Sequence, residues 1–196
     1  MECFYDDTLA APEIVELARK AERDGFDAVV ISCFFDPGLR AAREVLSIPI
    51  ASAGESSLLV ACSLGHRIGI VTTVANSIPV IRDLVKILGL ESQVGTVRAA
   101  SVGVLELDKS EKTIQALLGE TTRAIMEDKC DVIVLGCTGM AEVAADLQRR
   151  VLAAGYEVPM VDPLRAAIQW AEMLVNLKLK HSGIAYRKPP VKIRTS

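Results

Sequence analysis

The sequence predicts an α/β protein built from two pseudo-symmetric lobes, each a parallel sheet flanked by helices, with a site in the cleft between them. Two observations support this prediction. Short apolar segments bounded by glycine, proline and aspartate alternate with longer segments of helical periodicity, as in parallel sheets covered by helices on both faces. In addition, one arrangement of strand, cysteine and helix occurs twice along the chain.

The order of the elements follows from these patterns. Apolar runs of strand length predict strands at 28–33, 48–53, 68–73, 97–104, 131–136 and 158–161. Helical periodicity predicts helices at 12–24, 38–46, 55–64, 77–88, 110–128, 140–153 and 163–179. Asp36, Thr138 and Asp162 each precede a predicted helix and are residue types that favour the N-cap position. Pro37 suits the first helical position after Asp36.

The internal repeat aligns residues 27–33 with residues 131–137. In both segments an aspartate opens a short apolar run and a cysteine, Cys33 or Cys137, closes it. A helix follows each cysteine, then a short strand that begins near a proline, then another helix. Ligands of parallel α/β sheets bind at the carboxyl ends of strands, so both cysteines are predicted to face the cleft between the lobes.

The repeat also divides the chain. The first lobe is predicted to comprise residues 1–65 plus 163–196, and the second lobe residues 66–162. Before its cysteine strand the second lobe has a leading strand and helix and a further strand, whereas only 26 residues precede Asp27. We therefore expect the first lobe to be short at its N-terminus by a strand and a helix.

Composition and charge narrow the class of protein. The chain has 196 residues, 51% hydrophobic and 24% charged, which is enough to bury a core. Its net charge of −3 argues against a nucleic-acid partner. The start lacks the features of a secretory signal and the apolar runs are too short for a membrane span, so a cytoplasmic protein is expected. The basic tail after Arg187 is expected to be a solvated extension.

Five cysteines are expected to be free thiols, since an odd number in a reducing compartment argues against a disulfide framework. No two are spaced as Cys-x-x-Cys, and His66 and His181 lie near neither cysteine of the repeat, so no metal site is predicted. His66 and His181 are expected at the surface. The remaining cysteines are expected to be packing residues; these are Cys3, Cys62 and Cys130.

The position of Cys33 and Cys137 before helix N-termini suggests that both thiols are catalytic. The helix dipole is expected to lower the pKa of both thiols from the reference of about 8.5. Two facing thiols could act as acid and base, one removing a carbon-bound proton while the other delivers a proton to the opposite face. Backbone N–H groups around Gly136, Gly139 and the Thr72–Thr73 loop could hold the oxyanion of the intermediate.

Other catalytic motifs do not fit the sequence. Leu39 and Val143 stand six residues after the two cysteines, where a phosphatase loop requires arginine. The chain also lacks the glycine-rich phosphate-binding motifs and the Gly-x-Ser-x-Gly elbow of serine hydrolases.

Several segments together resemble the aspartate/glutamate racemase superfamily, and within it the hydantoin racemases. They are Cys33-Phe-Phe-Asp-Pro-Gly-Leu39 with Arg43-Glu44, Gly65-His-Arg67 into Val71-Thr-Thr73, Leu135-Gly-Cys-Thr-Gly-Met-Ala141, Val161-Asp-Pro163 and Ser182-Gly-Ile-Ala-Tyr186. The resemblance covers nearly the whole chain. Members of the family begin with a strand ending in an Asn-Pro-Asn-Thr-like loop, whereas this sequence resembles them only from about Tyr5 onward.

The resemblance implies an isomerase without a cofactor, in which Cys33 and Cys137 exchange the proton at C5 of a 5-substituted hydantoin or a related cyclic ureide such as allantoin. It also implies that substrate is held by the loop Val71-Thr72-Thr73 and by the backbone around Phe34, Thr138 and Gly139. The implied partner is a small molecule.

Two alternatives remain open at this stage. The chain could be an amino-acid racemase for aspartate or glutamate, although neither cysteine has an arginine or lysine beside it. It could also be a shortened, non-catalytic relative that acts as a binding protein. Unpaired sheet edges in a short first lobe would favour a homo-oligomer.

Overall fold

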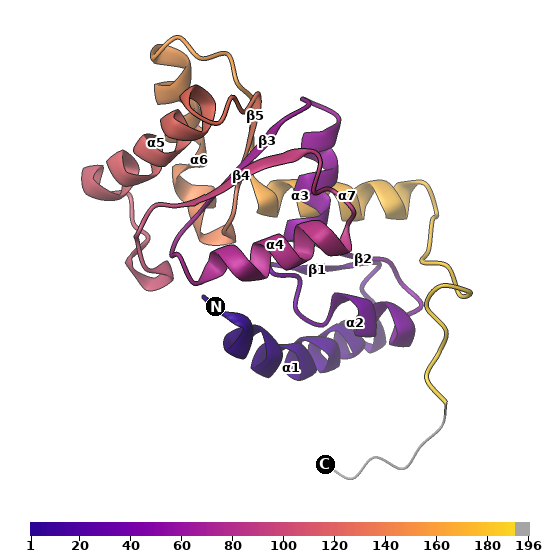
Figure 1. Cartoon of the computed structure of the whole chain (residues 1–196). Helices are drawn as coiled ribbons and strands as arrows, with labels where there is room; N and C mark the ends of the chain where they lie inside the picture. Colours follow the sequence, from indigo (N-terminus) through magenta and orange to yellow (C-terminus); the bar gives the residue numbers. More distant parts are fainter. Residues whose placement is uncertain (191–196) are drawn as a thin grey trace.

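The computed structural model describes residues 1–190 and contains two parallel sheets, which confirms the predicted α/β class. The smaller sheet pairs β1 (Val29–Ile31) with β2 (Ile50–Ser52). The larger has the order β4-β3-β5-β6, formed by β3 (Ile68–Thr72), β4 (Val94–Ala99), β5 (Val132–Leu135) and β6 (Met160–Val161). Figure 1 shows the two sheets stacked one above the other along the long axis of the molecule.

Helices connect the strands throughout. They are α1 (Phe4–Arg23), α2 (Leu39–Val45), α3 (Ala53–Cys62), α4 (Ser77–Ile87), α5 (Glu111–Met126), α6 (Ala141–Ala153) and α7 (Pro163–Asn176). Two single turns of 3₁₀-helix, η1 (Val104–Glu106) and η2 (Thr138–Met140), stand in the connections before α5 and α6. None of the helices in residues 1–190 combines the length and apolar character needed to cross a membrane.

Strands β3 and β5 form the buried centre of the larger sheet. All their residues are buried, because helices cover both faces of the sheet and such strands read as continuous apolar runs. Gly69 fits β3 because a Cβ there would lie 3.0 Å from the Cys130 sulfur. Cys130 is itself buried and Cys62 packs against the core, which confirms the packing role predicted for these two cysteines, whereas Cys3 is the N-cap residue of α1.

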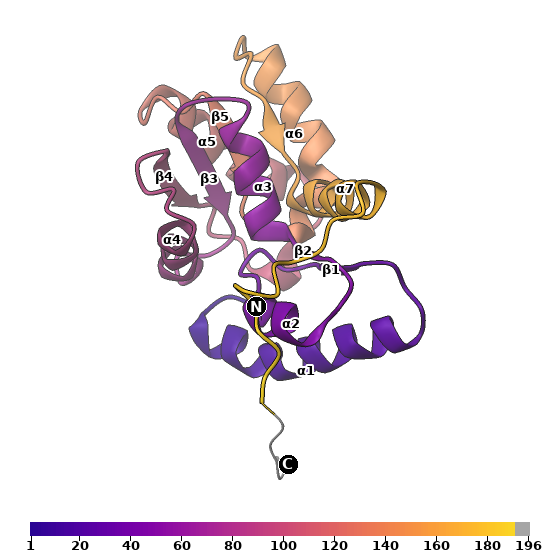
Figure 2. The same cartoon turned by 90° about the vertical axis from the view of Figure 1, so that its right-hand side faces the viewer.

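Helices cross between the two sheets. The helix that follows the smaller sheet, α3, packs on β5 and β6, and α7, which follows the larger sheet, packs back on β1 and β2. The two helices also pack on one another, as Figure 2 shows at the junction of the two layers. The division into lobes at residues 65 and 163 stays a prediction.

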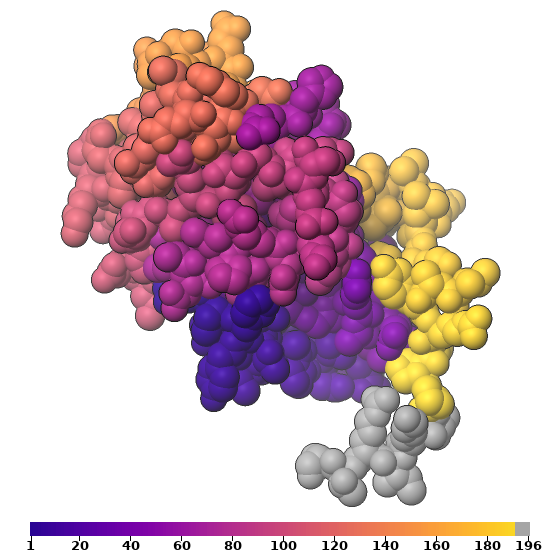
Figure 3. All heavy atoms as spheres, in the orientation of Figure 1, coloured from indigo at the N-terminus to yellow at the C-terminus, as the bar shows by residue number. Residues whose placement is uncertain are grey.

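The segment after α7 returns to the smaller sheet. His181 accepts a hydrogen bond at Nε2 from the Ile50 backbone N–H at 3.0 Å, so it is half-buried against β2 and not a surface residue as expected. Arg43 donates to the Tyr186 hydroxyl and forms a bidentate ion pair with Glu55. In Figure 3 this segment, in yellow, lies at the right-hand side of the molecule beside purple atoms of the N-terminal part of the chain. Residues 191–196 of the predicted basic tail lie outside the described residues.

Two predicted boundaries were wrong. The first helix begins at Phe4 and not at residue 12, and Asp6 and Asp7 occupy its first turn, where acidic side chains stabilise a helix. Strand β4 covers Val94–Ala99 and not 97–104, because its register is set by parallel pairing with β3, from Ile68 to Thr72.

Candidate active site

The two cysteines of the repeat line one cavity between the sheets. Cys33 lies just beyond β1 and Cys137 just beyond β5, so each sulfur stands at the carboxyl end of a parallel strand. The cavity has a volume of about 250 Å³. It is lined by Met1, Ser32, Cys33, Phe34, Phe35, Thr73, Ser77, Val104, Gly136, Cys137, Thr138 and Gly139. The repeat therefore brings its two thiols to the same space.

The loop after Cys33 is anchored by Asp36. Its Oδ1 accepts the N–H of Gly54 at 2.8 Å and its Oδ2 accepts the N–H of Glu55 at 2.7 Å. These N–H groups belong to the first turn of α3, so Asp36 caps α3 and not the helix that follows it in sequence, which corrects the prediction. Gly38, with a φ of 71°, is the N-cap residue of α2, and Pro37 precedes that helix.

The packing around this anchor is tight. A Cβ at Gly54 would lie 2.2 Å from the Phe34 carbonyl oxygen, so α3 begins directly against the cysteine loop. Asp36 adopts a φ of 58°, a left-handed conformation that aspartate and asparagine tolerate better than most residues. Burial raises the pKa of Asp36 to about 7, and the Gly54 and Glu55 N–H groups oppose this by stabilising the carboxylate. The anchor thus fixes the position of Cys33.

We expect Asp36→Ala to lower the free energy of unfolding by about 2–4 kcal/mol, because two buried N–H groups lose their acceptors and α3 loses its cap. Asp36→Asn keeps one strong acceptor and tolerance of the left-handed backbone, so it should cost less than half as much. Urea unfolding followed by circular dichroism measures both values. Equal stability of wild type and Asp36→Ala would contradict the anchoring role.

The loop after Cys137 bridges the two sheets. Cys137 is the N-cap residue of η2, and the Thr138 hydroxyl donates to the Ser32 carbonyl at 3.2 Å. Thr138 therefore does not cap α6 as predicted; it ties the second cysteine loop to the residue before Cys33. Gly139 is close to the second thiol, because a Cβ on it would lie 3.5 Å from the Cys137 sulfur and 2.9 Å from Leu107.

The two threonines at the end of β3 differ in position. Thr73 lines the cavity, as predicted for a substrate-binding residue, but Thr72 does not. The Thr72 side chain is buried, and its hydroxyl donates to the Gly136 carbonyl at 3.4 Å. A Cβ at Gly136 would lie 2.9 Å from the Thr72 Cβ. Thr72 thus supports the strand end that carries Cys137 and has no direct contact with the cavity.

Both thiols are more basic than predicted. Burial raises the pKa of Cys33 to about 11, against the lowering effect of the Phe35 backbone N–H. Burial also raises the pKa of Cys137, opposed by the backbone N–H groups of Gly139 and Met140. The predicted lowering was wrong because loss of water outweighs these few backbone dipoles. The charges of Asp36 and of Cys137 further raise the Cys33 pKa.

Several lining residues were not predicted from the sequence. Ser32 and Phe35 flank Cys33, and Ser77 opens α4. The N-terminal segment completes the wall: Glu2 accepts from the Val104 N–H at 2.8 Å and from the Ser77 hydroxyl at 3.3 Å. Ser77 follows β3 closely, so the rule that sites form at strand ends could have identified it.

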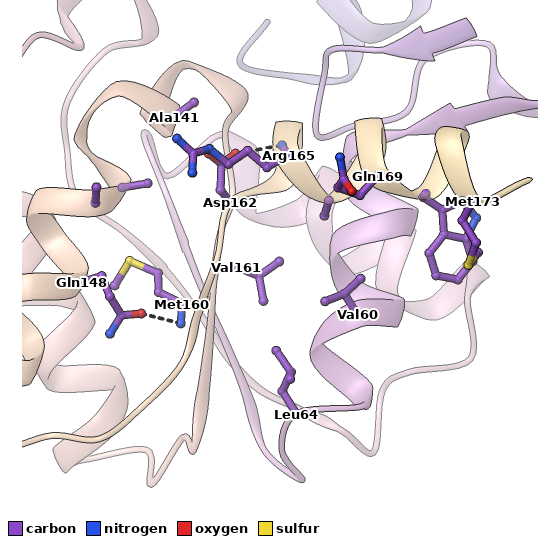
Figure 4. Close-up of a pocket in the computed structure, with 14 residues that line it drawn as sticks. Val60, Leu64, Ala141, Gln148, Met160, Val161, Asp162, Arg165, Gln169 and Met173 are labelled. Carbon is purple, nitrogen blue, oxygen red and sulfur yellow. Dashed lines mark hydrogen bonds and ion pairs between the residues drawn. The ribbon is translucent and has the colours of Figure 1, made fainter. Parts of the chain in front are cut away.

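No metal cluster accompanies the thiols. Within residues 1–190, histidine, cysteine, aspartate and glutamate side chains form no group of three that could hold a metal ion. A larger cavity of about 630 Å³ lies elsewhere, between α3, α6, β6 and α7. Figure 4 shows its largely apolar wall, which includes Met160, Leu64 and Met173 and contains neither cysteine of the repeat.

The fold and the site together define a class: an α/β protein of two parallel sheets with one cysteine at a strand end of each, both lining a shared cavity. The chain belongs to the Asp/Glu/hydantoin racemase family, whose sequence model matches residues 1–171, and this confirms the resemblance read from its motifs.

Similar proteins within this family include hydantoin racemases and allantoin racemases. The hydantoin racemase of Pseudomonas sp. (strain NS671) is 37% identical over 193 residues, which are 98% of this chain and 76% of that protein. The allantoin racemase from Klebsiella pneumoniae superposes with a TM-score of 0.92 at 33% identity, covering 100% of this chain and 79% of that one. The allantoin racemase from Pseudomonas fluorescens gives 0.90 at 34% identity, covering 99% and 81%.

Proposed function

We propose that this chain is a cofactor-independent racemase of 5-substituted hydantoins or a related cyclic ureide such as allantoin. The observation that carries the proposal is the shared cavity, in which Cys33 and Cys137 come from different sheets. The similarity to hydantoin and allantoin racemases supports this substrate class. Cys33 and Cys137 are the proposed catalytic residues.

The proposed reaction requires the two thiols to lie on opposite faces of the substrate carbon C5. A thiolate removes the proton from C5, the electron pair moves into the adjacent ring carbonyl, and the opposite thiol delivers its proton to the other face. The first cysteine ends as a thiol and the second as a thiolate, so solvent exchange restores the starting state. The product is the mirror image at C5.

Backbone groups and hydroxyls are proposed to hold the ring. Backbone N–H groups around Phe34, Thr138 and Gly139 would stabilise the developing oxyanion, as donors do in oxyanion holes. Thr73 and Ser77 carry hydroxyls that also line the cavity and can meet the polar edge of the ring. Thr72 acts through Gly136 and is proposed as a positioning residue.

The character of the wall favours a cyclic ureide over an acidic amino acid. None of the twelve described residues that line the cavity has a charged side chain, and the one charge among them is the N-terminal ammonium of Met1, which could pair with a single carboxylate. An amino-acid substrate carries a charged ammonium and one or two carboxylates, and burying them without charged partners is costly. A ring with uncharged carbonyl and N–H groups avoids this cost.

Chiral chromatography of single enantiomers tests the proposal. Wild-type protein should convert each enantiomer of a 5-substituted hydantoin or of allantoin into the racemate, faster than buffer alone. Cys62→Ala is a matched control, because this free cysteine lies outside the cavity. Racemisation of aspartate or glutamate in place of the ureides, or of none of these compounds, would contradict the proposal; tight binding without turnover would indicate a binding protein.

A further inference from the structure

The segment after α7 is fastened to the smaller sheet and its helix at two points. His181 bonds to the Ile50 backbone in β2, and the Tyr186 hydroxyl accepts a hydrogen bond from Arg43 of α2 at 3.2 Å. The residues between these two points are exposed. Figure 1 shows the segment, in yellow, running from α7 past α2. We call residues 181–186 the strap; none of them lines the cavity that contains the two cysteines.

Arg43 is a buried cation that directs all its hydrogen bonds to two side chains. Its side chain is 8% exposed, and it donates to both carboxylate oxygens of Glu55 and to the Tyr186 hydroxyl. Its Nε has no partner in the described part of the chain. The guanidinium also lies 5.4 Å from the centroid of the Tyr186 ring, which packs nearly perpendicular to the His181 ring. Because a buried charge that loses a partner is costly, Arg43 depends on the strap for its position.

Glu55 connects this pair to the loop after Cys33. Its carboxylate is held by Arg43 of α2, and its backbone N–H, in the first turn of α3, donates to the Asp36 carboxylate at 2.7 Å. Asp36 is the anchor of the Cys33 loop, and α2 begins directly after that loop. The strap therefore acts through Arg43 on both helices between which the loop is fixed.

The charge on Glu55 makes its pairing important for Asp36. Burial is the main cause of the raised pKa of Asp36, and the negative charge of Glu55 raises this pKa further. Without Arg43, Glu55 would be an unpaired carboxylate and would favour the protonated form of Asp36. A protonated carboxyl is a weaker acceptor for the Gly54 and Glu55 N–H groups. The ion pair with Arg43 thus supports the anchor.

We propose that Arg43 and Tyr186 are positioning residues for the racemase reaction. Through Glu55, the strap holds the loop that carries Cys33 in its reactive position. This inference rests on the proposed function, because it assigns Cys33 to proton transfer. Neither Arg43 nor Tyr186 lines the cavity, and Cys137 stands on a different loop, after β5. Loss of the strap contact should therefore loosen Cys33 and leave Cys137 in place.

Initial rates of racemisation with a ureide that wild type converts test the proposal. Tyr186→Phe removes one hydroxyl and keeps the ring, and it should lower kcat about threefold. Arg43→Lys keeps the charge but cannot bond both oxygens of Glu55 in a fork, so kcat should fall about tenfold. Arg98→Lys is the matched control, because Arg98 pairs with Asp128 away from the cavity; this variant should keep the wild-type kcat.

Alkylation of the cysteines gives a second readout that does not depend on turnover. Iodoacetamide labels thiols of the folded protein, and mass spectrometry of the peptides gives the rate at each cysteine. In Tyr186→Phe and Arg43→Lys the rate at Cys33 should rise at least about threefold relative to that at Cys137, because a looser loop exposes this thiol to water and lowers its pKa. Arg98→Lys should keep the wild-type ratio. Circular dichroism verifies that each variant is folded.

The outcomes separate this inference from the proposed function. An active wild type together with wild-type kcat in folded Tyr186→Phe and Arg43→Lys overturns the inference, and so does an unchanged labelling ratio. An equal rise at Cys33 and Cys137 overturns it too, since that result indicates general loosening of the fold. If wild type racemises none of the ureides, the proposed function fails, and the labelling ratio alone decides whether the strap holds Cys33.

Discussion

Replacing Cys33 or Cys137 by alanine is expected to lower kcat for racemisation by about 10²–10⁴-fold, the contribution of a positioned acid or base. Each direction of the reaction uses both thiols, so either substitution should impair both enantiomers. Removing both cysteines together should cost little more than removing one, because groups that act as a unit are not additive. Chiral chromatography of initial rates measures the effect.

The control for this prediction must separate chemistry from folding. Both cysteines are half-buried and alanine leaves only a small void, so urea midpoints should stay close to that of wild type. Cys62→Ala, which removes a half-buried thiol away from the cavity, should keep wild-type activity. A Cys33→Ala variant that racemises at the wild-type rate would exclude this residue from the reaction.

The activity is expected to rise with pH by about tenfold per unit from pH 6 to 8. The base must be a thiolate, and burial raises the pKa of Cys33 to about 11 and raises that of Cys137 as well. Below such pKa values the thiolate fraction increases tenfold for each pH unit. The value to measure is kcat/KM, which reports the ionisation of the free protein.

The direction of this dependence is diagnostic. The sequence predicted that helix dipoles lower both pKa values; a lowering large enough to bring both below neutrality would ionise both thiols, and activity would then fall as the pH rises. A flat or falling profile between pH 6 and 8 would therefore contradict the raised pKa values. Restricting the range to pH 8 keeps ionisation of the substrate ring from dominating the profile.

All strand positions except that of β4 were predictable, because they depend on local composition. The apolar run before each cysteine and the repeated aspartate placed Cys33 and Cys137 at strand ends, and both line the same cavity. A cleft between like halves follows from that repeat. Asp162 was also placed correctly, since its carboxylate caps α7 through the Leu164 and Arg165 N–H groups.

The errors arose where a contact joins segments distant in sequence. Asp36 resembles a cap for α2, yet its carboxylate reaches Gly54 and Glu55 because the cysteine loop folds onto α3. Thr138 resembles a local cap, yet it bonds to Ser32 across the two sheets. The prediction of lowered thiol pKa values was wrong for a related reason. The position of a cysteine before a helix can be read from the sequence, but the burial of both thiols between the two sheets cannot.

Deuterium incorporation at C5 of an enantiopure hydantoin in heavy water, followed by NMR and chiral separation, tests the two-thiol reaction most directly. The account predicts that, early in the reaction, the newly formed enantiomer carries deuterium whereas the remaining starting enantiomer keeps its proton, because separate groups serve the two faces. Equal labelling of both enantiomers would indicate a single base. No labelling beyond that in buffer would contradict racemase activity altogether.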